Sequence, residues 1–468
     1  MTPSVLMTKR ATTLEDVHKT LSPKPLLNQK ELRAFYRDEV NEVRGGDAIA
    51  RPVLGLQRAY GANFYKAFLM GHSGVGKSTE LTRLALRVGE QYQVIRFSAT
   101  NDLDPASFKP FDVLLLMIAE VAERTAQPEK EGGAGKKPSD RRLEEIWNWF
   151  ATDKETLTEA EHVAIELAAG AGVSPDSWWA KALGLFASIR GDAKYAADRK
   201  KEVVQYRLVR LSRLIELTNS VLDECNQLLK TVANKEWLFI GEDFDKTDIS
   251  VDLVEALFVT YANVFKDLRT HLMFTIPIDL VYSQHAARLP LTCHCIPDTP
   301  VYSRDHHPDD RGRKAVQAVV EARVSPALFE DNQMTRLIVA SGGNLRDLFF
   351  MVSHAADTAL LRGASRIGAD DASRAIREMR TDYARRLGQG RFDRDKVGYD
   401  EKADRLTKIY KGDPNAGIPD PILHTLLRAR AVQEFNDQRW FGLHPLVVDI
   451  LKSQGKLKAD APGGTDEN

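Results

Sequence analysis

A nine-residue stretch with three glycines, one lysine and three hydroxyl side chains matches the pattern GxxxxGK[ST]: Gly71, His72, Ser73, Gly74, Val75, Gly76, Lys77, Ser78 and Thr79. Glycines allow successive backbone N–H groups to approach phosphate oxygens, and a helix that follows directs its positive N-terminus at the same anion. We expect Lys77 to bind the β- and γ-phosphates of ATP and the Ser78 hydroxyl to bind Mg²⁺. His72 is not well placed for acid–base chemistry, so we expect it only to shape the loop.

Acidic residues follow a second buried run, Trp237–Ile240, as Glu242, Asp243 and Asp245. Hydrolysis needs one carboxylate that holds Mg²⁺ through water and another that orients or deprotonates the attacking water. Glu242 takes the usual metal-binding place and Asp243 the water-activating one, although the sequence does not decide which acid has which role. The alternative interpretation is a solvated acidic turn.

Two further side chains could read the γ-phosphate. Thr275, in the apolar run 271–278, could present its hydroxyl at a strand end, although an ordinary strand threonine is an equal alternative. In Ser341–Asp347, a glycine break precedes an N-cap at Asn344 and places Arg346 in the first helical turn. From there Arg346 could reach the nucleotide; the alternative is a surface arginine.

The elements that must position these residues form an α/β core. Short apolar runs predict five strands, at 64–70, 93–100, 237–240, 271–278 and 289–296. A helical stretch follows the phosphate loop, and strand–loop–helix–strand order indicates a parallel sheet. Near the C-terminus, Asp420-Pro421 predicts the start of a helix, and 431–435 with 439–443 predict a hairpin. Together they suggest a small winged-helix-like domain.

Composition narrows the class of protein. The chain has 468 residues, 43% of them hydrophobic and 28% charged, which is typical of a multidomain globular protein. Its 65 lysines and arginines against 66 acids give a net charge of -1, so no chain-wide field attracts nucleic acid or anionic lipid. Three cysteines and no stretch of signal-peptide or membrane-spanning character predict a cytoplasmic protein.

With these elements in order, the sequence resembles the AAA+/STAND branch of P-loop ATPases. The segments GHSGVGKSTEL, EDFDK and SGGNLRDL carry the resemblance, which extends over most of 31–365. It implies a five-stranded core in the order 5-1-4-3-2, a helical lid, a winged-helix domain, and ATP with Mg²⁺ as ligands. A looser resemblance to KAP-type ATPases implies a role in bacterial defence or signalling. Some of those relatives carry membrane helices, but here 164–191 is interrupted by Glu166, Asp176 and Lys181, so no membrane span is expected.

The expected division of the chain has five parts: a flexible lead-in at 1–30, an ATPase core at 31–325 with a helical insert at about 126–235, a lid at 326–400, a winged-helix-like domain at 401–455 and a disordered tail at 456–468. Within the insert, apolar residues at heptad spacing from Val204 to Val232 predict a long helix that packs on a neighbouring helix.

The expected function is an ATP-hydrolysing switch or assembly ATPase that acts as a homo-oligomer or with a separate effector protein. One alternative is a DNA-binding ATPase that uses the C-terminal domain and the basic stretch 374–396, which contains eight cationic and four acidic residues. Another is a scaffold that binds ATP without turnover. In an oligomer a neighbour's arginine would complete the site; the candidates are Arg288, Arg304, Arg311 and Arg313.

Overall fold

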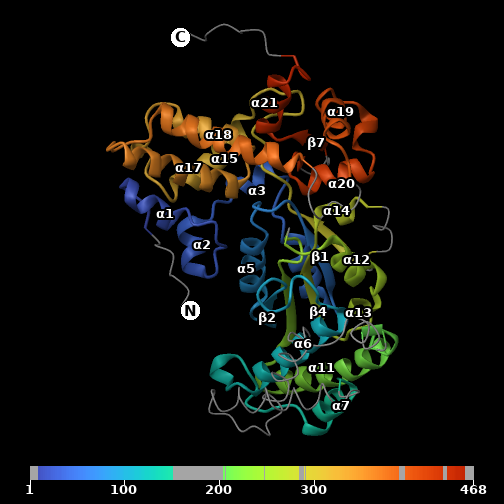
Figure 1. Cartoon of the computed structure of the whole chain (residues 1–468). Helices are drawn as coiled ribbons and strands as arrows, with labels where there is room; N and C mark the ends of the chain where they lie inside the picture. The colour runs from blue at the N-terminus through green and yellow to red at the C-terminus, as the bar shows by residue number, and fades with distance from the viewer. Residues whose placement is uncertain are drawn as a thin grey trace.

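The computed structural model describes residues 9–150, 204–205, 207–246, 248–283, 289, 291–388, 396–435 and 440–458. At its centre five parallel strands form one sheet in the order β2-β3-β4-β1-β5 (Figure 1). The strands are β1 Lys66–Met70, β2 Tyr92–Ser98, β3 Glu236–Glu242, β4 His271–Thr275 and β5 Thr292–Cys295. This order is that of a P-loop NTPase core, and it confirms the predicted order 5-1-4-3-2.

The sheet register brings the predicted functional segments to one edge. Leu69 of β1 pairs with Thr275 of β4, and Ser98 of β2 pairs with Glu242 of β3. Because all strands are parallel, their carboxyl ends share this edge, where ligands bind in open α/β sheets. The loop after β1 therefore lies beside the acidic end of β3.

Both faces of the sheet are covered, so the inner strands β1, β3 and β4 are almost continuously buried, whereas the edge strands β2 and β5 include partly exposed polar residues. On one face, α6 (Pro110–Ala126) and a cluster of aromatic side chains that includes Phe68, Phe244 and Phe274 form a buried core. On the other face, α4 (Ala50–Ala59) and α5 (Lys77–Val88) pack through Leu56, Leu81 and Leu84, among other apolar residues.

The insert contributes α7 (Asp140–Phe150) and α11 (Leu211–Ala233), which lie beyond the sheet end opposite the lid in Figure 1. Helix α11 packs on α6 and α7, as the heptad pattern predicts, but it begins at Leu211 and not at Val204, because the chain turns at Arg210. The run 164–191 lies outside the described residues. Within the part of the chain that the structure describes, no helix is both long and apolar enough to span a bilayer.

The lid and the C-terminal helices share one hydrophobic core. The lid consists of α15 (Asp310–Glu321), α16 (Gln333–Ala340), α17 (Leu345–Leu361) and α18 (Ala369–Arg386). The C-terminal part contains α19 (Tyr399–Tyr410), α20 (Pro421–Arg428), the antiparallel pair β6 (Val432–Phe435) and β7 (Trp440–Leu443), and α21 (Pro445–Ser453). The predicted hairpin strands are thus present, while the turn between them lies outside the described residues.

Three predicted boundaries need correction. Helix α15 belongs to the lid core, so the lid begins near 310 rather than 326. The segment 9–28 is not a flexible lead-in: η1 (Leu14–Asp16) and α1 (Val17–Thr20) bury their apolar side chains against α17. At the other end, Leu457 is buried in the same core, so the predicted tail does not begin at 456.

The segment that precedes α4 is not one continuous helix. The structure has α2 (Gln29–Phe35) and α3 (Glu39–Val43), with extended backbone at Tyr36 between them. The Tyr36 hydroxyl donates a 2.7 Å hydrogen bond to Glu80 of α5. The break therefore places Tyr36 against α5, the helix that follows the phosphate loop.

Candidate nucleotide-binding site

The loop between β1 and α5 has the backbone that phosphate binding requires. Gly71, Gly74 and Gly76 have φ values of 147°, 95° and 105°, which side-chain-bearing residues rarely adopt. Helix α5 begins at Lys77, so its free N–H groups face the loop. These local conformations make a concave donor surface suited to an anion.

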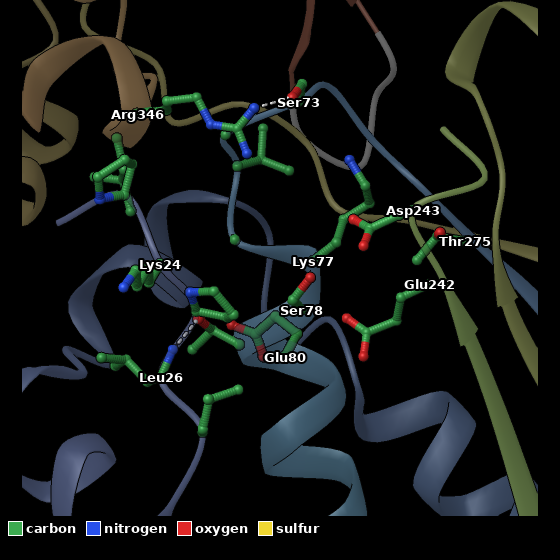
Figure 2. A pocket seen from close by; sticks show the side chains of 18 of the residues that line it. Lys24, Leu26, Ser73, Lys77, Ser78, Glu80, Glu242, Asp243, Thr275 and Arg346 are labelled. Atoms are coloured by element: carbon green, nitrogen blue, oxygen red, sulfur yellow. Dashed lines mark hydrogen bonds between the residues drawn. The ribbon is translucent and has the colours of Figure 1, made fainter. Parts of the chain in front are cut away.

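A cavity of about 670 Å³ opens over this loop. The loop residues from Ser73 to Thr79 line it, together with the ends of β3 and β4, the start of α17 and the N-terminal segment. Figure 2 shows Lys24 and Leu26 across the cavity from Asp243 and Thr275. Gly71 and His72, the first two residues of the predicted nucleotide-binding loop, do not line this cavity but line a neighbouring one.

Lys77 is held by three oxygens. Its Nζ donates to the carbonyls of Gly71 and His72 at 2.6 and 2.9 Å, and it lies 2.9 Å from Asp245 Oδ2. Both charged side chains are only 7% exposed. Burial by itself would raise the pKa of Asp245, but the charge of Lys77 holds it below its ordinary value. A phosphate that recruits Lys77 must therefore compete with Asp245.

Asp245 is a residue that the sequence analysis noted but did not assign to the site. It lies two positions beyond Asp243 on the turn after β3, where the chain bends back toward the loop. Its spacing from Asp243 was the available signal. Sequence alone does not reveal which of three neighbouring acids will face the lysine.

Glu242 and Asp243 already have partners from β2. Arg96 donates its Nε to Glu242 Oε1 at 2.7 Å, and the Ser98 hydroxyl donates to Asp243 Oδ2 at 2.7 Å. Asp243 also has a φ of 66°, a backbone conformation disfavoured for a residue with a side chain. The Ser98 hydroxyl therefore occupies one of the acceptor positions of the Asp243 carboxylate.

Thr275 supplies an unused donor at the end of β4. Its hydroxyl is buried and has no hydrogen-bond partner among the described residues. Such an atom is costly unless a ligand or water satisfies it. Figure 2 shows Thr275, Ser78 and Glu242 around the same part of the cavity. These are hard oxygen ligands of the kind that Mg²⁺ prefers, so the side chains present fit the predicted metal.

The lid reaches the loop through the helix start at α17. Asn344 caps this helix by accepting from the N–H groups of Arg346 and Asp347, and its Nδ2 donates to the Ser73 carbonyl at 2.9 Å. Arg346 donates to the Ser73 hydroxyl at 2.5 Å, as Figure 2 shows. Arg346 is therefore directed into the site rather than at the surface.

The C-terminal part also reaches the loop, which the sequence did not indicate. Arg430, in the left-handed region at φ 59°, donates to the Ser73 carbonyl at 3.1 Å. Its other guanidinium nitrogen lies 3.0 Å from Asp347 in a buried ion pair. Nothing in the local pattern around residue 430 distinguishes this arginine from its neighbours, because its role arises only when the domains pack.

Behind the loop, His72 lies next to a buried acid. His72 Nε2 is 3.7 Å from Asp298, and both oxygens of that carboxyl lack a hydrogen-bond partner in the described chain. Burial and the charge of Lys77 lower the pKa of His72 to about 3. Burial raises the pKa of Asp298 to about 7. Both groups are thus disposed to be neutral, which supports a structural role for His72.

The far end of the cavity is mostly apolar and suits a base. Leu26 donates its N–H to the Thr79 hydroxyl, which ties the N-terminal segment to the loop. Val40, Val319 and Phe349 line this end. Arg323 lies there between the rings of Phe35 and Phe349, and burial lowers its pKa to about 9. Because the N-terminal segment was expected to be flexible, the sequence analysis did not predict that residues 23–27 would line the cavity.

The four arginines considered as donors to a neighbouring subunit's site differ in placement. Arg288 lies outside the described residues. Arg304 and Arg311 are exposed, whereas Arg313 donates to the Val301 carbonyl and lies over the ring of Tyr302. Arg304 and Arg311 are thus the described candidates with side chains available to a second copy.

No protein-family model and no curated protein matches this sequence. Among solved structures, the chain is similar to the ADP form of the ORC2 protein of Aeropyrum pernix, with 12% identity, a TM-score of 0.41, and coverage of 94% of this chain and 99% of that one. A Walker-type ATPase of Pyrococcus abyssi, paby2304, has 12% identity and a TM-score of 0.40 over 92% and 99% of the two chains. The Drosophila ORC structure bound to DNA has 10% identity and a TM-score of 0.38 over 98% of this chain and 83% of that chain. Similarity at this level does not define a family, so the fold rests on the strand order and the phosphate loop.

Proposed function

We propose that this protein is an AAA+-type ATPase in which Mg-ATP sets the arrangement of the lid and the C-terminal domain. The observation that carries the proposal is the convergence on Ser73. Asn344 and Arg346 of the lid and Arg430 of the C-terminal part all bond to this one residue of the phosphate loop. A ligand that reshapes the loop therefore acts on both domains directly.

The chain's own residues account for binding. Lys77 and the N–H groups of the loop would hold the β- and γ-phosphates, and Ser78 with Glu242 would hold Mg²⁺. The bound metal would neutralise phosphate charge. Thr275 would donate its free hydroxyl to a phosphate oxygen.

Hydrolysis requires a second set of movements. Asp243 would turn from Ser98 and accept the proton of the attacking water. Arg346 would exchange the Ser73 hydroxyl for the γ-phosphate, since Arg346 and Ser73 both line the cavity over the phosphate loop. The lid would then be held by the nucleotide, and hydrolysis would release it.

The role in the cell belongs to the same proposal. The resemblance in sequence supports a switch in a bacterial defence or signalling system, working as a homo-oligomer or with a separate effector. The DNA-binding alternative is less favoured, because three described cations of the basic stretch already have partners within the chain. Arg374 pairs with Glu378, Arg385 pairs with Asp382, and Arg380 bonds to Ser453 of α21.

Binding is tested with Lys77→Ala and Lys314→Ala, the second altering an exposed lysine of the lid. Calorimetry with Mg-ATP should show that Lys77→Ala abolishes high-affinity binding, because the loop loses its mobile cation. Lys314→Ala should bind as the wild type does. Unchanged affinity in Lys77→Ala would contradict the nucleotide site itself.

The switch is tested by light scattering and turnover at several protein concentrations. If a neighbour's arginine completes the site, activity per chain rises with concentration and ATP enlarges the scattering species. Constant activity from a monomer would leave Arg346 as the sole γ-phosphate sensor and remove the oligomer from the proposal.

A further inference from the structure

A second cavity, of about 540 Å³, lies between the core, the lid and the C-terminal part. It shares four wall residues with the nucleotide cavity: Ser73, Asp245, Lys246 and Arg346. Three of these participate in contacts that ATP would rearrange, namely the Arg346–Ser73 hydrogen bond and the Asp245–Lys77 ion pair. The partition between the two cavities is therefore made of the groups expected to move during turnover.

The second cavity is strongly basic. Six cations line it, from the core, from lid helices α17 and α18, and from the C-terminal part: Lys246, Arg346, Arg385, Arg386, Arg428 and Arg430. Two acids oppose them, Asp245 and Asp279. Asp245 is already paired with Lys77, and burial raises the pKa of Asp279 despite the nearby charge of Arg428. Three of the six cations have carboxylate partners outside the lining: Lys246 pairs with Asp243, Arg385 with Asp382 and Arg430 with Asp347. The other three, Arg346, Arg386 and Arg428, form no ion pair within the described part of the chain.

Arg386 has a donor available to an anion. Its Nη1 is buried without a hydrogen-bond partner in the described part of the chain, while the guanidinium lies 4.6 Å from the centre of the Tyr383 ring. Arg428, which lines the same cavity from the C-terminal part, donates one nitrogen to the Ile249 carbonyl. Guanidinium groups are suited to oxyanions because they offer donors in a planar fork.

We propose that this cavity receives the inorganic phosphate that leaves the nucleotide site. The inference rests on the proposed ATPase function. In that reaction the water oxygen bonds to the γ-phosphorus, the bond from γ-phosphorus to the β–γ bridging oxygen breaks, and the water proton passes to Asp243 and then to solvent. ADP stays on the loop, and the phosphate passes the Arg346–Ser73 contact to Arg386 and Arg428.

This route links product release to the C-terminal part. Arg386 ends a lid helix, and Arg428 ends α20 two residues before Arg430, which bonds to the phosphate loop. A phosphate between the two arginines would bridge the lid and the C-terminal part until it leaves. The bridge would hold the domains in their post-hydrolysis arrangement.

The experiment compares wild type, Arg386→Ala, Arg386→Lys and Arg377→Ala, the last altering an exposed arginine on the same helix. Equilibrium dialysis of radiolabelled phosphate against the ADP-loaded protein is the first measurement. Arg386→Ala should bind phosphate about tenfold more weakly, with Arg386→Lys intermediate and Arg377→Ala unchanged. Equal ADP affinity in all four proteins shows that the nucleotide site is intact.

The second measurement compares single-turnover ATP cleavage with the appearance of free phosphate at a fluorescent phosphate sensor. Arg386→Ala should leave cleavage unchanged and alter the interval between cleavage and release. Unchanged phosphate affinity and release would overturn the inference. So would a protein that binds a short oligonucleotide through Arg386 but does not bind phosphate alone. Absence of ATP cleavage in the wild type would instead contradict the proposed function.

Discussion

Replacing Asp245 by asparagine should make ADP bind more tightly. In the structure the Lys77 Nζ lies 2.9 Å from Asp245 Oδ2, with both side chains 7% exposed. A phosphate must take Lys77 away from this carboxylate, and the carboxylate then remains beside the incoming anion. Asparagine keeps an oxygen that can accept from Lys77 but carries no charge, so it competes less with the phosphate.

The expected size follows from the change in hydrogen bond. A bond to a charged group contributes about 1.5–3 kcal/mol, whereas a neutral bond contributes about 1 kcal/mol. The substitution therefore weakens the competing state by about 0.5–2 kcal/mol. This corresponds to a dissociation constant for ADP roughly two- to thirtyfold lower. The nucleotide-free variant should also unfold more easily, and ADP should restore more of its stability than in the wild type.

The assay is calorimetric titration of ADP in the presence of EDTA, which removes any part that Asp245 has in holding a metal. Asp248→Asn is the matched control, since Asp248 is exposed and lies on the same turn. It should bind ADP as the wild type does. Equal or weaker ADP binding by Asp245→Asn would refute the view that Asp245 competes with phosphate for Lys77.

Three further outcomes are expected. Asp243→Asn should keep ATP bound and lower turnover by about a hundredfold or more, because a general base contributes that much; wild-type turnover would make the acidic end of β3 a solvated turn. Arg430→Ala leaves Asp347 buried without its ion-pair partner, so chemical denaturation should show a loss of about 3–5 kcal/mol, which Arg430→Lys should partly restore. Asp298→Asn should gain stability over the wild type as pH rises. The wild type loses stability between pH 4 and 7, where the unfolded chain ionises and the folded Asp298, with its pKa raised to about 7, does not. Unfolding at pH 5 and pH 8 should show the advantage of Asn growing by about 2.5 kcal/mol, and a constant difference would contradict the raised pKa.

The fold could be predicted because its signals are local. The inner strands β1, β3 and β4 are short, mostly apolar runs, and the glycine loop between β1 and α5 fixes where the ligand edge lies. The N-terminal helices were missed because η1 and α1 are only three and four residues long, and their burial comes from α17 rather than from their own sequence. Short helices are unstable without such packing.

The candidate site divides in the same way. Lys77, Ser78 and Arg346 follow from motifs whose spacing fixes their chemistry, and the structure brings them to one cavity. Arg430 and Arg96 could not be found, since each acquires its partner from a segment distant in the sequence. Ion pairs of this kind depend on the packing of domains and strands, which composition and periodicity do not encode.

The third residue of the phosphate loop and the glycine after it serve two purposes. A side chain at Gly74 would place its Cβ 2.3 Å from Asn344 Oδ1 and 2.7 Å from Arg346 Cβ, so glycine there allows the lid to approach as well as phosphate. Ser73 receives the lid and the C-terminal part on the same stretch of backbone. A change in the conformation of this loop therefore alters the contacts of Ser73 with Asn344 and with Arg430 directly, without intermediate residues. Coupling between ligand and domains requires only that the loop favour different contacts with and without phosphate.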